Sequence, residues 1–401
     1  MKKVYIWGVG YHAEYVYSMI DRNECTVEGF VDSDSTKQGM SWKNQITVYS
    51  PGQLSEMDYD YIIISIIKYE SIEQSCKKLG IPNEKVIAFW KEPNDIKIFK
   101  NRIQEVLEER KKRKILENRL DSAPYEWGIE MTPQIDSAEK LLKKMIRDHS
   151  SLCRFGDGEF EIMRGNNRAW FQETSETLRR RLLQIIRSDH SSINIAVAQN
   201  FKNLERFNEE AADIIRDYMA FQTRKDILKF LDMRRSYYDA YVTRPYILYQ
   251  DKENANTIFP LFKELWKGRS VIIVEGKYGR NGVNNDLFHT AHEMKRVLCP
   301  PQNAWKSYDR IKESILKIAK KDDLICISLG PAATVLAYDL AEGGYQAVDI
   351  GQVDNEYDWY IGGAKERMAI RGKMVAEYLE NRLPEDIGDE AYHSQIMIEI
   401  E

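Results

Sequence analysis

The chain has 401 residues, of which 43% are hydrophobic and 30% are charged, and its formal net charge is −5. This length is enough for two or three domains, and the charge balance argues against a general nucleic-acid or membrane-surface binder. The five cysteines are scattered without a CxxC pair, which indicates a reducing compartment rather than a disulfide framework or a structural zinc site. The longest apolar run, residues 61–67, is too short to cross a bilayer. We therefore expect a cytoplasmic protein with no integral membrane segment and no nucleic-acid partner.

The N-terminal part has the order of a dinucleotide-binding βαβ unit. A buried strand over residues 3–7 runs into Gly8 and Gly10, a helical pattern follows, and a second strand ends at Asp32. Such a unit holds a diphosphate at the helix N-terminus and a ribose hydroxyl on the acidic residue. Further strands and helices complete a small α/β domain over residues 1–94. It resembles the Rossmann-like domains attached to capsule and surface-sugar enzymes, including the N-terminal domains of sugar acyltransferases. A site for NAD or another nucleotide, a dehydrogenase site and a structural or partner-docking role all remain open.

Residues 95–134 indicate a charged linker. Apolar residues recur at spacings of three and four, which is typical of an amphipathic helix, at Ile96, Phe99, Ile103, Val106 and Leu107. The nearly continuous charge over residues 108–114 is typical of a solvated helix face. The apolar stripe could also pair two subunits in a homo-oligomer. Pro124 and Pro133 then predict a loop.

The sequence CRFGDGEF, residues 153–160, is the strongest candidate for chemistry in the second domain, which we place over residues 135–401. In an extended or turning backbone, Asp157 and Glu159 point the same way and can converge on one cation, and Mg²⁺ and Mn²⁺ prefer such oxygen ligands. Gly156 permits close approach of a ligand, and Arg154 offers a donor fork for phosphate oxygens. A Gly- and Asp-rich surface turn is the alternative interpretation.

Further candidates follow the expected strands of the second domain, which include residues 270–276 and 324–330 and a strand end at residues 241–246. Open α/β sheets bind ligands beyond the carboxyl ends of their strands, which favours substrate contacts at Arg244, Glu275, Arg280, Gly282, Asn285 and Asp286. Gly330 precedes a proline at an expected helix start, where free amides attract a diphosphate, and Thr334 lies one turn further on. Asp354 and Glu356 belong to a carboxylate cluster in an expected loop, and either could be a general base toward an acceptor hydroxyl or a further metal ligand.

Four motifs in this order look like the GT-D-type glycosyltransferases: CRFGDGEF, VIIVEGKYGRNGVNNDLF, ISLGPAATVLAYDLAEGGYQAVDIG and VDNEYDW. The resemblance covers about residues 135–400. It implies a Rossmann-like fold and transfer of a hexose from a nucleotide sugar, UDP-linked, to a sugar acceptor in surface-glycan, capsule or glycoprotein biosynthesis. The Asp-x-Glu motif of that family falls on Asp157 and Glu159. Other members often carry histidine where this chain has Gln352, so the resemblance supplies no base at that position.

The chemistry of such a transfer agrees with the residue types. Negative charge develops on the departing diphosphate, and a divalent ion, Mn²⁺ or Mg²⁺, neutralises it as a Lewis acid. Arg154, Arg280 and the helix beginning near Pro331 would add fixed positive potential. We therefore predict two Rossmann-like α/β domains joined by a charged helical linker, with glycosyltransferase chemistry in the second. Two other functions remain open: a nucleotide-sugar oxidoreductase or epimerase run from the N-terminal domain, and a non-enzymatic docking protein of a glycan assembly complex.

Overall fold

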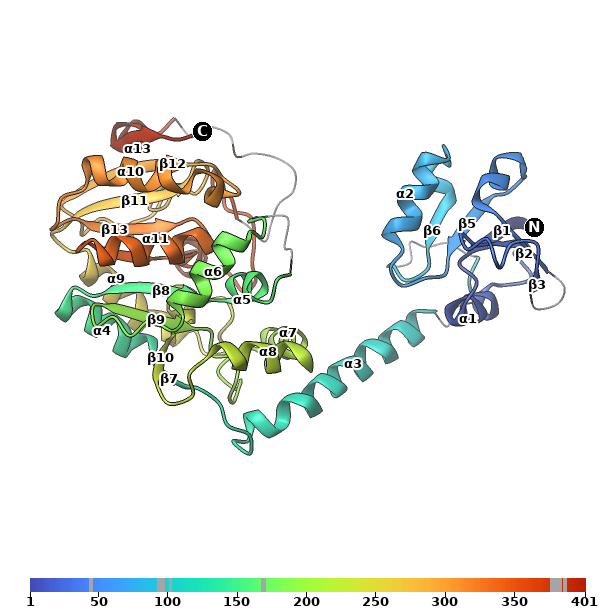
Figure 1. Ribbon diagram of the computed structural model, residues 1–401, viewed down its shortest axis with the longest axis horizontal. Helices are drawn as coiled ribbons and strands as arrows, with labels where there is room; N and C mark the ends of the chain where they lie inside the picture. Colours follow the sequence, from blue (N-terminus) through green and yellow to red (C-terminus); the bar gives the residue numbers. More distant parts are fainter. Residues whose placement is uncertain (43–45, 92–97, 101–102, 167–170, 376–383, 385–387) are drawn as a thin grey trace. The chain divides into compact units, whose positions relative to one another are not determined.

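The computed structural model describes residues 1–42, 46–91, 98–100, 103–166, 171–375, 384 and 388–401. Its contacts divide the chain into two compact units, Met1–Lys114 (unit 1) and Ile115–Glu401 (unit 2) (Figure 1). The division falls inside helix α3 (Ile103–Glu126). Residues 95–97 and 101–102 of the predicted linker lie outside the described residues. No described helix is long and apolar enough to span a membrane.

Unit 1 is built on a six-stranded sheet with the order β3-β4-β2-β1-β5-β6. Its strands are β1 (Lys2–Trp7), β2 (Cys25–Val31), β3 (Ser41–Trp42), β4 (Ile46–Tyr49), β5 (Tyr61–Ile64) and β6 (Val86–Ala88). All neighbours are parallel except β3 and β4. Helix α1 (Tyr11–Met19) connects β1 to β2, and helix α2 (Glu70–Lys78) connects β5 to β6. The two connections leave the sheet in opposite directions, so the switch point of this sheet lies between β1 and β5.

Unit 2 contains a nine-stranded parallel sheet with the order β15-β12-β11-β13-β14-β8-β9-β10-β7. Its strands are β7 (Gln134–Asp136), β8 (Ser151–Phe155), β9 (Ile193–Val197), β10 (Ser236–Asp239), β11 (Ser270–Gly276), β12 (Glu293–Cys299), β13 (Leu324–Ser328), β14 (Gln346–Asp349) and β15 (Ile396–Glu399). The expected α/β architecture is therefore confirmed in both units.

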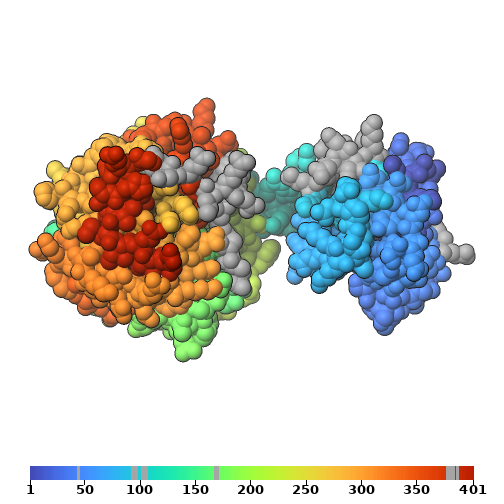
Figure 2. All heavy atoms as spheres, turned by 90° about the horizontal axis from the view of Figure 1, so that it is seen from above, coloured from blue at the N-terminus to red at the C-terminus, as the bar shows by residue number. Residues whose placement is uncertain are grey.

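Helices cover both faces of the unit 2 sheet (Figure 1). One face packs on α6 (Glu176–Ile185), α10 (Tyr308–Ile318) and α11 (Pro331–Glu342), and the other on α4 (Ala138–Asp148), α9 (Glu253–Leu265) and α12 (Val353–Ile361). Successive residues of a strand alternate between faces. In β13, Ile325 and Ile327 therefore join one core cluster and Cys326 joins the other. Figure 2 shows the C-terminal helix α13 (Glu390–Gln395) and β15, in red, at the surface of unit 2.

Three expected local structures differ from the observed ones. Residues 241–246 are not a strand end; the 3-10 helix Ala240–Thr243 follows β10 there. The carboxylate cluster around residue 356 is not a loop but helix α12, whose first turn tolerates Asp354 and Glu356 because acidic groups are stabilised at a helix N-terminus. Pro124 lies inside the last turn of α3 rather than in a loop.

All five cysteines are buried thiols. They are distributed over four strands and one helix, at Cys25, Cys76, Cys153, Cys299 and Cys326. Burial raises the pKa of each thiol, to about 11 for Cys76 and to about 12 for Cys299 and Cys326.

Candidate functional site

A cavity of about 440 Å³ lies at the carboxyl ends of the unit 2 strands. The chain runs from β8 to β9 on one side of the sheet and from β11 to β12 on the other, so the connections diverge around β13 and β14. Such divergence leaves a crevice beyond the strand ends, where open α/β sheets bind their ligands. Residues after β8, β11, β13 and β14 all line the cavity.

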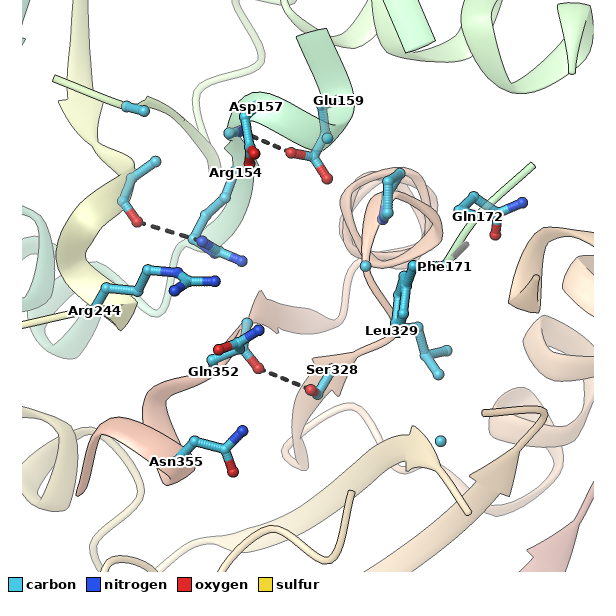
Figure 3. Close-up of a pocket in the computed structure, with 18 of the residues that line it drawn as sticks. Arg154, Asp157, Glu159, Phe171, Gln172, Arg244, Ser328, Leu329, Gln352 and Asn355 are labelled. Carbon is cyan, nitrogen blue, oxygen red and sulfur yellow. Dashed lines mark hydrogen bonds between the residues drawn. The ribbon is translucent and has the colours of Figure 1, made fainter. Parts of the chain in front are cut away.

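Asp157 and Glu159 both line the cavity, but they do not lie on an extended backbone. Helix α5 (Asp157–Met163) begins at Asp157, with Gly156 as its N-cap. Because successive helical residues are rotated by about 100°, side chains two residues apart point in directions about 200° apart. Asp157 is exposed to the cavity. The Glu159 Oε2 atom instead accepts a hydrogen bond of 2.7 Å from the Gly156 N–H (Figure 3). The expectation of parallel side chains is therefore wrong.

Arg154 reaches the cavity from the end of β8, and its guanidinium is held by hydrogen bonds to Asp349 and Ala240. Its Nη2 atom donates to Asp349 Oδ1 at 3.1 Å, and its Nη1 atom donates to the Ala240 carbonyl at 3.3 Å. Asp349 is buried, which raises the pKa of its carboxyl, and the charge of Arg154 opposes that rise. Burial and then the Asp349 charge raise the pKa of Glu159 to about 7. The charge of the Arg154 guanidinium therefore acts on the carboxyl groups of both Asp349 and Glu159.

Arg244 and Arg367 bring two more guanidinium groups to the same cavity. Figure 3 shows Arg154 and Arg244 coming from neighbouring segments of the wall. The N-termini of α11 and α12 also face the cavity through Gly330 and Gln352, and neither helix has a side-chain cap. Unpaired amides at helix N-termini favour anions. The lining of the cavity therefore includes three arginines and two helix N-termini.

Both predicted general bases lie away from the cavity wall, because α12 turns them to different sides. The Asp354 carboxylate is buried and accepts from the Gly282 N–H at 2.7 Å, from the Asn285 amide at 2.8 Å and from Lys373. Glu356 is fully buried, and its Oε2 atom accepts from the Tyr246 and Ile247 N–H groups at 3.0 and 2.9 Å. Neither placement supports proton abstraction from an acceptor.

The predicted substrate-binding loop after β11 is likewise held inward. The buried Glu275 carboxylate accepts from Arg296 Nη1 at 2.6 Å and from the Asn281 N–H at 2.7 Å. Arg280 Nη1 donates to the Gly372 carbonyl at 2.6 Å, and Asp286 accepts from Lys263 and Tyr357.

Six predicted contact residues do not line the cavity: Glu275, Arg280, Gly282, Asn285, Asp286 and Thr334. The Thr334 hydroxyl instead donates to the Arg154 carbonyl at 2.9 Å. Arg154, Gly156, Arg244 and Gly330 do line the cavity.

The structure adds wall residues that were not predicted to contact a substrate. Phe171 packs over Gly330, whose φ is +58°, and a Cβ built at Gly330 would come within 2.4 Å of the Phe171 ring. Asn200, Tyr218, Tyr241, Tyr278 and Asn355 also line the cavity. Asn200 and Tyr241 follow β9 and β10, so the strand-end rule applied to every strand could have found them, whereas Tyr218 lies on a helix and had no such signal.

The predicted nucleotide residues of unit 1 surround the carboxyl end of β1. Gly8 has a φ of +103°, and a Cβ there would come within 2.8 Å of Ser65 Oγ. Gly10 is the N-cap of α1. The Asp32 carboxylate accepts from the Val9 N–H at 2.8 Å and from Lys37 Nζ at 3.1 Å. Asp32 therefore already pairs with a backbone amide of the glycine loop.

Comparison with known families identifies the larger unit. Residues 152–378 match the model described as "Glycosyltransferase GT-D fold", which is more than half of the chain. The chain belongs to the GT-D-fold glycosyltransferase family. In this GT-D-fold chain, residues 1–87 match a different model, "C2185-like, N-terminal".

Two curated streptococcal proteins are relatives of this GT-D-fold chain. "Glycosyltransferase GlyD" of Streptococcus pneumoniae serotype 4 (strain ATCC BAA-334 / TIGR4) is 34% identical over 268 residues, which is 67% of this chain and 32% of that protein. "Probable glycosyl transferase Gly" of Streptococcus gordonii is 33% identical over 264 residues, which is 65% of this chain and 38% of that protein. The matched part is thus about a third of the length of these relatives.

Solved structures agree with the family. A structure titled "The highly conserved domain of unknown function 1792 has a distinct glycosyltransferase fold" is 33% identical, with a TM-score of 0.64, and covers 71% of this chain and 98% of that one. "A New Glycosyltransferase (DUF1792) from Streptococcus sanguinis" is 32% identical, with a TM-score of 0.62, and covers 67% of this chain and 100% of that one.

Of the described residues that line the cavity, Asp157 and Glu159 carry the carboxylates that could hold a divalent ion. Among the described residues, no group of three or more His, Cys, Asp or Glu side chains is arranged to hold a metal. Mg²⁺ and its analogues, however, often bind through one or two carboxylates together with substrate phosphates. Asp157, exposed on the cavity wall, fits that mode, whereas Glu159 would first have to release the Gly156 N–H.

Proposed function

We propose that this chain transfers a hexose from a nucleotide sugar, UDP-linked, to a sugar acceptor in surface-glycan, capsule or glycoprotein biosynthesis. The observation that carries the proposal is the cavity of unit 2. It brings one exposed carboxylate, Asp157, into the same cavity as three arginines and two helix N-termini. A nucleoside diphosphate carrying a divalent ion presents the complementary charges.

The chain's own residues would act mainly by binding and positioning. Arg154, Arg244 and Arg367 would stabilise the charge that develops on the diphosphate as the glycosidic bond breaks. Asp157 would hold Mn²⁺ or Mg²⁺, and Glu159 would fix the first turn of α5 through its bond to Gly156. The ion, when bound, supplies Lewis-acid neutralisation of the leaving group. Gln352 and Asn355 offer amide groups to sugar hydroxyls.

The test is release of UDP from a panel of UDP-sugars, with and without Mn²⁺, for the wild-type chain and Asp157→Asn. We expect metal-dependent release that Asp157→Asn lowers by about 100-fold or more, because the variant loses a charge that acts on the transition state. Asp309→Asn is the matched control, since Asp309 lies in the first turn of α10 and does not line the cavity. Release that is indifferent to both metal and Asp157→Asn would contradict the proposed site.

Nucleotide binding by unit 1 stays a prediction. A ligand at Gly8 and Gly10 would compete with the Asp32 carboxylate for the Val9 N–H. Calorimetry on the full chain, with NAD and with UDP in separate titrations, checks it. Tight NAD binding there would favour the oxidoreductase alternative, and the absence of UDP binding by the wild-type chain would favour the docking-protein alternative.

A further inference from the structure

The C-terminal third of α3 is docked on the helix pair α7 (Glu209–Met219) and α8 (Gln222–Phe230) of the same unit. Glu126 accepts from Arg216 Nε at 2.8 Å and from Arg216 Nη2 at 2.9 Å, which is a bidentate pair. Asn118 donates to Asp217 at 2.8 Å. This part of the predicted linker, which follows the charged run over residues 108–114, is therefore hydrogen-bonded to helix α7 of unit 2.

A second group of bonds lies at the turn between α7 and α8. Arg224, 2% exposed, donates from Nη1 to Asp121 at 3.0 Å and from Nη2 to the Ser122 hydroxyl at 3.1 Å, and its guanidinium lies 4.5 Å from the Tyr125 ring. Asp121 also accepts from the Phe221 N–H at 3.1 Å. Buried, hydrogen-bonded charges of this kind define one geometry, because a displaced partner is left uncompensated.

The opposite side of α7 forms a wall of the cavity. Ala211, Ile214, Ile215 and Tyr218 line it, and α7 has no charged residue on that wall. Arg216 and Tyr218 are two residues apart, and therefore point in directions about 200° apart on the helix. The Tyr218 hydroxyl lies 3.5 Å from the Asp157 carbonyl. On the cavity side the wall is thus apolar, and Ile214 is 60% exposed.

We propose that α3 braces this wall, with Glu126 and Arg216 as positioning residues for the transfer reaction. The inference rests on the proposed function of the cavity. Ala212 and Met219 anchor α7 to the core, but apolar packing tolerates small shifts, whereas a bidentate ion pair with both side chains 15% exposed specifies direction and distance. Hydrogen bonds from Arg216 and Ser122 outweigh burial and hold the pKa of Glu126 below its ordinary value, so the pair is ionised at neutral pH.

The test combines kinetics with hydrogen exchange on the full chain. We expect Glu126→Ala and Arg216→Ala each to raise KM for a substrate by about 10-fold or more at nearly constant kcat, because a wall displaced by about 1 Å binds poorly. The double variant should be no worse than the poorer single variant, and Arg216→Lys should recover part of the loss. Amides of α7 should exchange faster in these variants, while those of α11 stay unchanged.

Arg180→Ala is the matched control, because it removes an exposed arginine–carboxylate pair on α6, Arg180 with Glu176, away from α7. Unchanged α7 exchange with unchanged KM would overturn the brace, as would additive losses in the double variant. If Glu126 and Arg216 only stabilise the fold, the two alanine variants would lower the melting temperature and leave KM unchanged. If the wild-type chain transfers no sugar, the proposed function fails, and the exchange of α7 still decides whether α3 braces it.

Discussion

Arg154 can occupy its place in the cavity because residue 351 has no side chain. Gly351 has a φ of +49°, and a Cβ there would come within 2.2 Å of Arg154 Nη2 and 2.9 Å of Thr243 Oγ1. The flexible end of Arg154 would move away, and the buried Asp349 carboxylate would lose its cation. The absence of a Cβ at residue 351 therefore leaves room for the ion pair between Arg154 and Asp349.

We expect Gly351→Ala to abolish most transfer activity and to lower the free energy of unfolding by about 2–4 kcal/mol, partly from the left-handed backbone and partly from the broken ion pair. Gly363→Ala is the control, because its φ is +63° and its Cβ would meet nothing within 4 Å. It should cost only about 1 kcal/mol. Denaturant unfolding and activity assays check both; equal effects of the two variants would disprove the displacement of Arg154.

Glu159 makes the stability of the free protein depend on pH. Its pKa is raised to about 7 in the folded chain, against about 4.3 in the unfolded chain. The neutral carboxyl therefore favours folding, with a contribution that is complete below about pH 4 and is lost as the pH rises through 7. Unfolding free energy should fall by on the order of 1 kcal/mol or more between about pH 5 and pH 8. Denaturant titrations across this range should show a smaller slope in Glu159→Gln.

At the scale of elements, α12 shows why the carboxylates of one motif lie on different sides of a helix rather than together in a loop. Asp354 and Asp358 are four residues apart and share one side of the helix, where Lys373 binds both. Glu356 points the other way, toward the Tyr246 and Ile247 amides. A helix assignment for residues 353–361 would have separated these carboxylates, but the dense acidic composition resembled a loop. No local sequence pattern indicates that Lys373 is the cation that pairs with Asp354 and Asp358.

We expect Lys373→Met to lower the free energy of unfolding by about 3–5 kcal/mol, because it leaves the buried Asp354 carboxylate and the partly buried Asp358 carboxylate without their cation. The Lys373 side chain is 1% exposed. Lys263→Met removes a more exposed pair with Asp286 and should cost about 1 kcal/mol or less. Chemical denaturation compares the two. Similar losses would mean that Lys373 does not balance the charges of α12.

The strands were more predictable than the loops that follow them. The apolar runs over residues 270–276 and 324–330 correctly indicated β11 and β13, because buried parallel strands need apolar residues on both faces. The polar loop after β11 looked like a ligand site, yet Glu275 is paired with Arg296, 21 residues further along the chain. Such pairs depend on strand order, which local patterns do not encode. Arg154 and Asp157 were found because two glycine-preceded carboxylates with an arginine just upstream form a local motif, which can be read without knowing the strand order.

At the scale of the whole molecule, each unit has its own hydrophobic core. We expect Ile63→Ala, in the core of unit 1, to lower the stability of that unit by about 2–5 kcal/mol without changing the transfer activity. Ile273→Ala is the matched substitution in β11 of unit 2 and should impair activity at elevated temperature. Calorimetry should show two transitions, each shifted by one variant. A single transition moved by both would mean that the units unfold together.

The buried cysteines have a practical consequence for spectroscopy. A thiol reagent attacks the exposed thiolate, and the five native thiols are both buried and raised in pKa. We therefore expect the native cysteines to react little with thiol-directed dyes. Cysteines introduced at the exposed Met40 of unit 1 and Met397 of unit 2 would each accept a fluorophore. Energy transfer between the two dyes would then report the separation of the units during turnover.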